Sequence, residues 1–168
     1  MKFVFDSTVL MYFAKLGILG KLAGAVEGVI PVSVYEEVVF EGKKKGIDDA
    51  LLIEKLVADG LFKVAAAKDK ALLDYLSKIP ALSYADSETL ALAKELRAIA
   101  VFDETASRSV AELQGIRFHG SVFLLFILFR RNLIAKADIK LYVDRMIGIG
   151  WRCSTEFYAA ILSEIEKI

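Results

Sequence analysis

The chain has 168 residues, a formal net charge of zero and 56% hydrophobic residues. This composition excludes a disordered protein, and the zero net charge means that any basic surface for nucleic acid has to be local. The length fits a single domain over residues 1–168 with a core of its own. One cysteine, Cys153, and one histidine, His119, argue against a disulfide, a thiolate zinc cluster, a histidine metal site and a Ser-His-Asp triad.

The longest unbroken apolar stretch covers residues 122–129 and is too short for the roughly 20 residues that cross a bilayer. The apolar residues at the N-terminus are interrupted by Asp6, and no small-residue cleavage site follows, so they are not typical of a signal peptide. The sequence therefore predicts a cytoplasmic protein with no membrane partner.

Short apolar strands and longer helices are predicted to alternate along the chain. The expected strands are residues 2–5, 28–30, 61–64, 99–102 and 116–118, and the expected helices are residues 8–17, 34–41, 48–59, 69–78, 84–97 and 105–114. An apolar helix then follows Gly120-Ser121, and two amphipathic helices complete the chain. Strands separated by helices favour right-handed crossovers and a parallel sheet covered on both faces. The predicted class is a three-layer α/β fold.

Serine N-caps are predicted for two of these helices. Ser33 is expected to cap the helix 34–41 in a capping box with Glu36, and Ser83 is expected to cap the helix that follows it. Between residues 42 and 46 a basic loop is expected.

Two of the strands stop on an aspartate, in MKFVFD at the start of the chain and AIAVFD in its middle. In an open parallel sheet the ligand crevice lies beyond the carboxyl ends of the strands, so Asp6 and Asp103 are expected at that edge. Helices that follow strands begin at the same edge. Glu37, one turn beyond Ser33, and Asp86, in the first turn after Ser83, are therefore expected to join them.

Four carboxylates at one edge repel one another unless a cation neutralises them, and oxygen ligands suit Mg²⁺ or Mn²⁺. Such a site can activate water for hydrolysis of a phosphodiester. Glu88 and Glu104 are second-rank candidates for the ligand set. The residues leave other roles open, since Asp6 can be a plain N-cap and Asp86 or Glu104 can complement a helix dipole.

Cations for a phosphate backbone are predicted at Lys43, Lys44, Lys45 and Arg108, although charged loops are usually only solvated. Arg130 and Arg131 are weighed in the same way. The helix 122–129 is apolar around nearly its whole circumference, so it is expected to be buried in the core or against a second copy in a homodimer.

Six stretches together resemble the PIN-domain ribonucleases, and among them the toxins of VapBC toxin–antitoxin pairs. They are FDSTVLMYFAKLG (5–17), IPVSVYEEV (30–38), ADSETLALAKEL (85–96), VFDETASRSVAELQGI (101–116), HGSVFLL (119–125) and WRCSTEFYAAIL (151–162). Their order and spacing span nearly the whole chain.

The resemblance implies a PIN-like parallel sheet in the order 3-2-1-4-5, flanked by helices. It also implies metal-dependent cleavage of single-stranded or looped RNA and a cognate antitoxin protein as partner. The acids that it implies as the site are Asp6, Glu37, Asp86 and Asp103, with Glu88 as a further acid.

Two alternatives remain beside a metal-dependent endoribonuclease. One is a catalytically inactive PIN fold that binds RNA or serves in an assembly. The other is a phosphotransfer fold, which fits badly: an aspartate-nucleophile phosphatase needs a second aspartate two residues after Asp6, where Thr8 stands. A receiver domain needs a phosphoacceptor after the third strand, which here ends in Val64-Ala65-Ala66.

Overall fold

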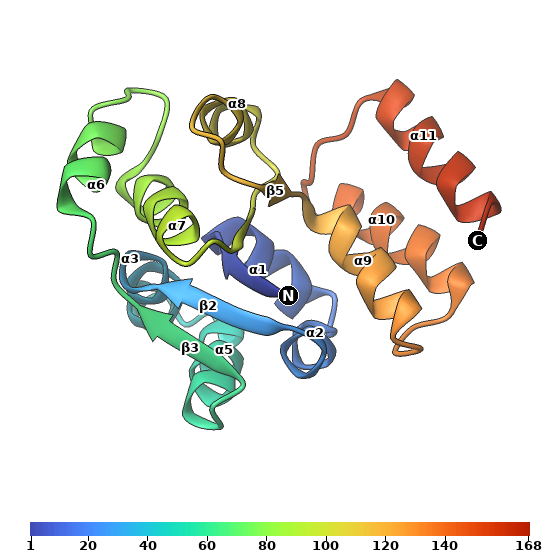
Figure 1. Ribbon diagram of the computed structural model, residues 1–168. Helices are drawn as coiled ribbons and strands as arrows, with labels where there is room; N and C mark the ends of the chain where they lie inside the picture. The colour runs from blue at the N-terminus through green and yellow to red at the C-terminus, as the bar shows by residue number, and fades with distance from the viewer. The chain divides into compact units, whose positions relative to one another are not determined.

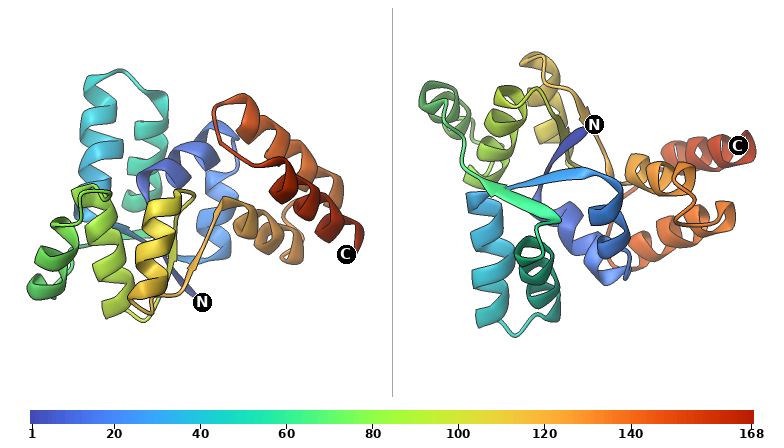
Figure 2. Two further views of the ribbon diagram at one scale, coloured as in Figure 1. Left: turned by 90° about the horizontal axis from the view of Figure 1, so that it is seen from above. Right: turned by 60° about the horizontal axis from the view of Figure 1, so that its bottom comes forward.

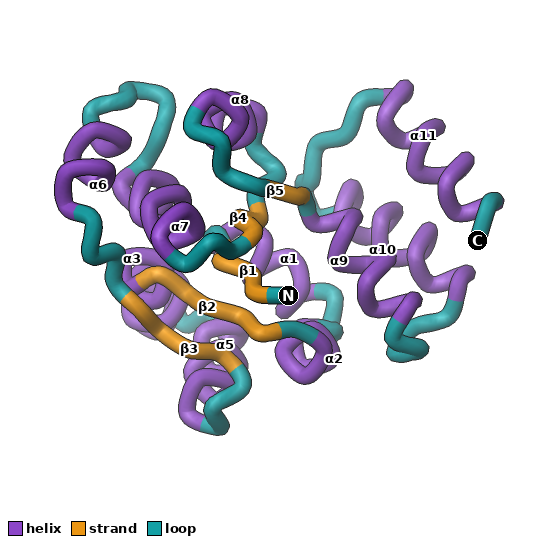
Figure 3. Tube along the Cα trace, in the orientation of Figure 1, coloured by secondary structure: helices purple, strands orange, loops and turns teal.

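A computed structural model of residues 1–168 contains a five-stranded parallel sheet in the order β3-β2-β1-β4-β5. The strands are β1 (Lys2–Phe5), β2 (Glu27–Pro31), β3 (Phe62–Ala65), β4 (Ile99–Val101) and β5 (Phe118–His119) (Figure 3). The predicted strand order and α/β class are therefore confirmed.

The chain divides into two compact units, Met1–Ser121 and Val122–Ile168. The first holds the sheet with α1 (Ser7–Lys15), α2 (Leu19–Ala25), α3 (Val32–Tyr35), the π-helix η1 (Glu36–Glu41), α4 (Gly42–Lys44), α5 (Asp48–Ala58), α6 (Lys70–Ser77), α7 (Tyr84–Glu95) and α8 (Thr105–Leu113). Helices α7 and α8 lie on one side of the sheet and α1, α2 and α5 on the other (Figures 1 and 2). The sheet is thus the middle of three layers.

The central strand β1 carries the core of the first unit. Phe3, Val4 and Phe5 are fully buried, as expected for a strand that is covered on both faces. In register, Phe3 lies opposite Gly28 of β2, and Phe5 lies opposite Val101 of β4. The chain therefore leaves this strand at the middle of the carboxyl edge of the sheet.

The predicted capping box at Ser33 is wrong. The helix begins two residues earlier than predicted, at Val32, and the side chain of its N-cap residue Pro31 has no hydrogen-bond acceptor. Ser33 instead donates both its N–H and its hydroxyl to the carboxylate of Glu88 on α7. A charged acceptor from another element forms stronger hydrogen bonds than a local cap, and the sequence around Ser33 does not show it.

The N-cap predicted at Ser83 is confirmed. The Ser83 hydroxyl accepts from the N–H of Asp86, and the Asp86 carboxylate accepts from the N–H of Ser83, which completes a capping box. The basic segment predicted as a loop differs from the structure, because its first residues form the short helix α4.

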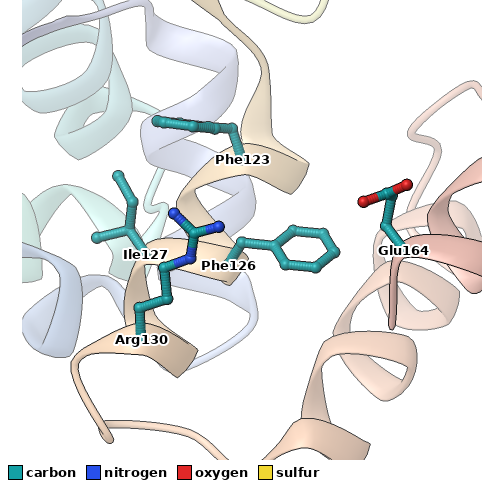
Figure 4. Close-up of a pocket in the computed structure, with 5 residues that line it drawn as sticks. All are labelled: Phe123, Phe126, Ile127, Arg130 and Glu164. Atoms are coloured by element: carbon teal, nitrogen blue, oxygen red, sulfur yellow. The ribbon is translucent and has the colours of Figure 1, made fainter. Parts of the chain in front are cut away.

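The second unit consists of α9, which starts at Ser121 and ends at Arg130, with α10 (Lys136–Gly148) and α11 (Thr155–Glu166). Residues 122–129 are expected to be buried in the core or against a second copy, and within the single chain α9 is only half-buried along one side. A hollow of about 170 Å³ lies there (Figure 4). It is lined by Phe123, Phe126, Ile127, Arg130 and Glu164.

No single helix is long and apolar enough to cross a membrane. Helices α1 and α2 reach that length and apolar character only when counted together, and a sharp bend separates them.

Gly28 is predicted to be essential for packing between β1 and β3. A Cβ at this position would overlap the ring of Phe62 and lie 2.9 Å from Cε2 of Phe5, and the two rings already pack edge to face at 5.6 Å. We expect Gly28→Ala to lower the free energy of unfolding by about 1–3 kcal/mol, as overpacking of a core does. Urea unfolding measures the change.

The matched control is Gly20→Ala in α2, where an added Cβ meets nothing within 4 Å. Because alanine is the better helix former, this variant should be as stable as the parent or up to about 1 kcal/mol more stable. Equal destabilisation by both substitutions would contradict the packing argument.

Candidate active site

The candidate site lies at the carboxyl edge of the sheet, where β1 and β4 end side by side. The N–H of Asp6, the first residue after β1, donates to the carbonyl of Val101, the last residue of β4, at 3.4 Å. Asp103 follows two residues later. The two aspartates therefore leave neighbouring strands at the same edge.

Asp6 is buried and serves as the N-cap of α1. Its carboxylate accepts hydrogen bonds from the N–H groups of Ser7, at 2.7 Å, and Thr8, at 3.4 Å, and from the Ser7 hydroxyl. The capping role considered for this residue is thus present. These hydrogen bonds do not offset the cost of burying the negative charge, because burial still raises the pKa of Asp6 to about 7.

Two further acids act on Asp6 through their charges. After burial, the negative charge of Asp86 is the next largest cause of the raised pKa of Asp6, and Glu104 adds to it. Asp86 is itself buried in the first turn of α7, and Glu104 is the exposed N-cap residue of α8. Asp6, Asp86 and Glu104 form what we call the acidic triad.

Asp103 has a different environment because protein donors already satisfy it. Its carboxylate accepts from the N–H of Ser121 at 2.9 Å and from the Ser121 hydroxyl, and Nη2 of Arg108 lies 3.4 Å away. Arg108 is held in turn by a hydrogen bond from Nε to the carbonyl of Phe102. A Cβ on Gly120 would overlap the Arg108 guanidinium, so a larger residue here would make that side chain move away from its place beside Asp103.

Sequence reasoning missed the part of Gly120 and Ser121 in this site. The available signal was their place directly after β5, the same place that Asp6 and Asp103 take near β1 and β4. His119, the last residue of β5, has its pKa lowered by burial and by the charge of Arg108. Its imidazole is therefore neutral at neutral pH.

Glu88 is buried, and its carboxylate accepts hydrogen bonds from other parts of the protein. Beyond the two hydrogen bonds from Ser33, it accepts one from the N–H of Ala67 at 3.4 Å. These bonds join α7 to the segments that follow β2 and β3. Glu88 thus binds the framework of the carboxyl edge together.

The remaining candidates are exposed to solvent. Glu37 is exposed at the start of η1. Lys43 and Lys44 are exposed and form ion pairs with Glu54 and Glu41, while Lys45 is exposed beside them. Of the cations predicted to contact phosphate, only Arg108 lies beside a candidate acid. As they stand, no three acidic, histidine or cysteine side chains are close enough to hold one metal ion.

The chemistry of the acidic triad nevertheless fits a hard divalent cation. Its donors are carboxylate oxygens, and Asp6 is a buried acid whose neighbours Asp86 and Glu104 add negative charge. A divalent cation favours such oxygen ligands and offsets their repulsion. Asp103 needs a cation less, because Arg108 already pairs with it.

Comparisons with known proteins agree with this fold. A family model described as a PIN domain matches residues 2–167, so the chain belongs to the PIN-domain family. A PilT N-terminus domain protein from the archaeon Sulfolobus solfataricus P2 has a similar fold, with 22% sequence identity and a TM-score of 0.50. The match covers 74% of this chain and 91% of that one. No curated protein matches.

The PIN domain is a nuclease fold, and its members typically use divalent metals. In this chain the buried acid Asp6 lies at the carboxyl edge of that fold's sheet.

The raised pKa of Asp6 predicts a specific pH dependence of stability in metal-free buffer. Between its ordinary value of 3.8 and about 7, the native state keeps a proton that the unfolded chain releases. The stability contributed by that proton is complete below about pH 4 and is lost as the pH rises through 7. Asp6→Asn removes this dependence and still caps α1, because asparagine is an equally good N-cap.

Urea unfolding in EDTA at several pH values checks this expectation. The free energy of unfolding of Asp6→Asn should rise relative to that of the parent as the pH increases from 4 to 7. A constant difference between the two proteins over this interval would show that Asp6 is ionised throughout.

Proposed function

We propose that the chain is a divalent-metal-dependent endoribonuclease. The observation that carries the proposal is the burial of Asp6 beside Asp86 and Glu104 at the carboxyl edge of a PIN-domain sheet. Keeping a buried acid next to two like charges costs stability unless a cation or a proton compensates it. In a nuclease, acids arranged in this way would bind a divalent cation tightly.

Asp6, Asp86 and Glu104 would hold the cation, with Asp103 and Glu37 as further members of the proposed acidic set. A bound Mg²⁺ or Mn²⁺ supplies charge neutralisation at the phosphate and a water of lowered pKa. Ser121 keeps the Asp103 carboxylate in one orientation. Arg108, exposed in part beside Asp103, is placed to contact a phosphate oxygen of the RNA.

A toxin in a toxin–antitoxin pair is the proposed biological role, supported by the resemblance of six stretches of the sequence to such toxins. An antitoxin protein can silence an acidic site by inserting an arginine or a lysine among its carboxylates. The pairing of Arg108 with Asp103 shows that this edge of the sheet accepts a guanidinium.

Cleavage of single-stranded RNA should require Mg²⁺ or Mn²⁺ and stop in EDTA. Asp6→Asn and Asp103→Asn should each lower turnover by at least roughly 100-fold, because each changes the charge at the site without changing side-chain size. Glu112→Gln, an exposed position on α8, is the matched control and should retain activity. Initial rates on a labelled RNA measure all three variants.

If the parent protein binds RNA but leaves it intact with either metal, the chain is the inactive binding module instead. Cleavage that persists in EDTA would remove the metal from the proposal.

A homodimer is proposed from the half-buried side of α9, because twofold dimers are the commonest closed assemblies. Phe126 lines the hollow on this helix. We expect the parent to scatter light as a dimer at micromolar concentration and Phe126→Glu to be a monomer. Ile147→Glu changes an exposed apolar residue of α10 in the same way and should leave the dimer intact. A monomeric parent protein would contradict this assembly.

A further inference from the structure

A second polar site lies at the opposite edge of the sheet from the acids. A pocket of about 250 Å³ opens where β4 and β5 begin and where α7 and α8 end. Ala98, just before β4, and Gly115 and Ile116, just before β5, form part of its lining. The other lining residues are Ala93 and three cations, Lys94, Arg97 and Arg117.

The charge of this pocket is entirely positive. Its lining includes no carboxylate, and Lys94, Arg97 and Arg117 form no ion pair. Lys94 reaches only Oε1 of Gln114, at 3.5 Å, and Arg117 donates to the carbonyl of Arg97 at 2.6 Å. Most N–H donors of the three side chains are thus available, and all three residues are exposed to solvent.

Arg97 occupies a backbone conformation that an arginine rarely adopts. It follows the end of α7 with a φ of 50°, in a Schellman turn closed by the bonds from Arg97 N–H to Lys94 and from Ala98 N–H to Ala93. Glycine is the residue that takes this left-handed position without strain. Elsewhere in this chain the left-handed positions are held by Gly17, Gly46, Gly60, Gly115, Gly150 and Asn132.

The helix dipole alone does not require an arginine at position 97. A cation in the last turn of a helix is favourable, and Lys94 already provides one for α7. Arg117 comes from the segment that enters β5, and its side chain brings a further positive charge to the same place. Strained backbone positions cluster at functional sites, and here the left-handed residue brings a guanidinium to a pocket with two other cations.

We propose that this pocket binds a phosphate group, held by Lys94, Arg97 and Arg117. Guanidinium and ammonium groups form charge-assisted hydrogen bonds with phosphate oxygens, and a concave site with no competing acid favours them. An RNA backbone and a small phosphate compound both carry this group. With RNA as the source, which rests on the proposed nuclease function, the pocket anchors the strand away from the site of cleavage.

The test measures binding to the full chain in EDTA, so that it does not depend on catalysis or on the acidic triad. The probes are pyrophosphate, followed by calorimetry, and a short labelled single-stranded RNA, followed by fluorescence anisotropy. Arg97→Gly should weaken binding roughly tenfold, the effect of losing a charged hydrogen bond. For RNA, the slope of log affinity against log salt should also fall by about 0.7.

Arg97→Gly also separates a ligand role from a structural one. Glycine relieves the left-handed backbone, so the melting temperature should stay the same or rise by up to about 4 °C while binding is lost. Lys94→Gln removes a second cation without altering the backbone and should weaken binding as well. Arg152→Gly, an exposed arginine outside the pocket, is the control with the same change of charge.

Loss of both probes in the two pocket variants supports a phosphate site that RNA can use, and loss of pyrophosphate alone supports a site for a small phosphate compound. The proposal is overturned if the parent binds neither probe, or if Arg152→Gly weakens binding as much as Arg97→Gly. A lower melting temperature with unchanged binding also overturns it, since Arg97 then serves only its helix.

Discussion

The fold buries a carboxylate at the end of its central strand, and much of the local structure follows from that constraint. Because β1 lies in the centre of the sheet with both faces covered, the residue that follows it emerges between its neighbours. Asp6 is therefore desolvated, close to other acids and tied to the first turn of α1. The residue that caps α1 is therefore also a buried acid whose negative charge is stabilised by binding a proton or a cation.

The acids at this edge fall into two groups that differ in how their charge is compensated. Glu88 and Asp103 accept hydrogen bonds from donors far away in the chain, and those bonds hold the framework in place. Asp86 and Glu104 instead act through their negative charges on Asp6 and raise its pKa. The first group is held in place by these hydrogen bonds, and the second group concentrates negative charge around Asp6.

Charge is also divided between the two edges of the sheet. The acids collect where the strands end and the following helices begin, whereas Lys94, Arg97 and Arg117 collect where β4 and β5 begin. Each group sits on the first unit, Met1–Ser121, which alone contains the sheet. The acidic edge and the cationic pocket thus lie at opposite ends of the strands of one sheet.

The sequence alone determined the α/β class, the strand order through the family resemblance, and the place of Asp6 and Asp103 after buried strands, because apolar periodicity and chain order are local properties. It also predicted the capping box at Ser83, whose partners are three residues apart.

Only the tertiary structure decided what each polar group contacts. The partner of Ser33 lies 55 residues away on α7, and the partner of Asp103 lies 18 residues away after β5, so no local pattern reveals either. The left-handed backbone of Arg97 likewise depends on how α7 ends against β4. Hydrogen bonds and desolvation act through space, and the folded chain alone sets which residues share that space.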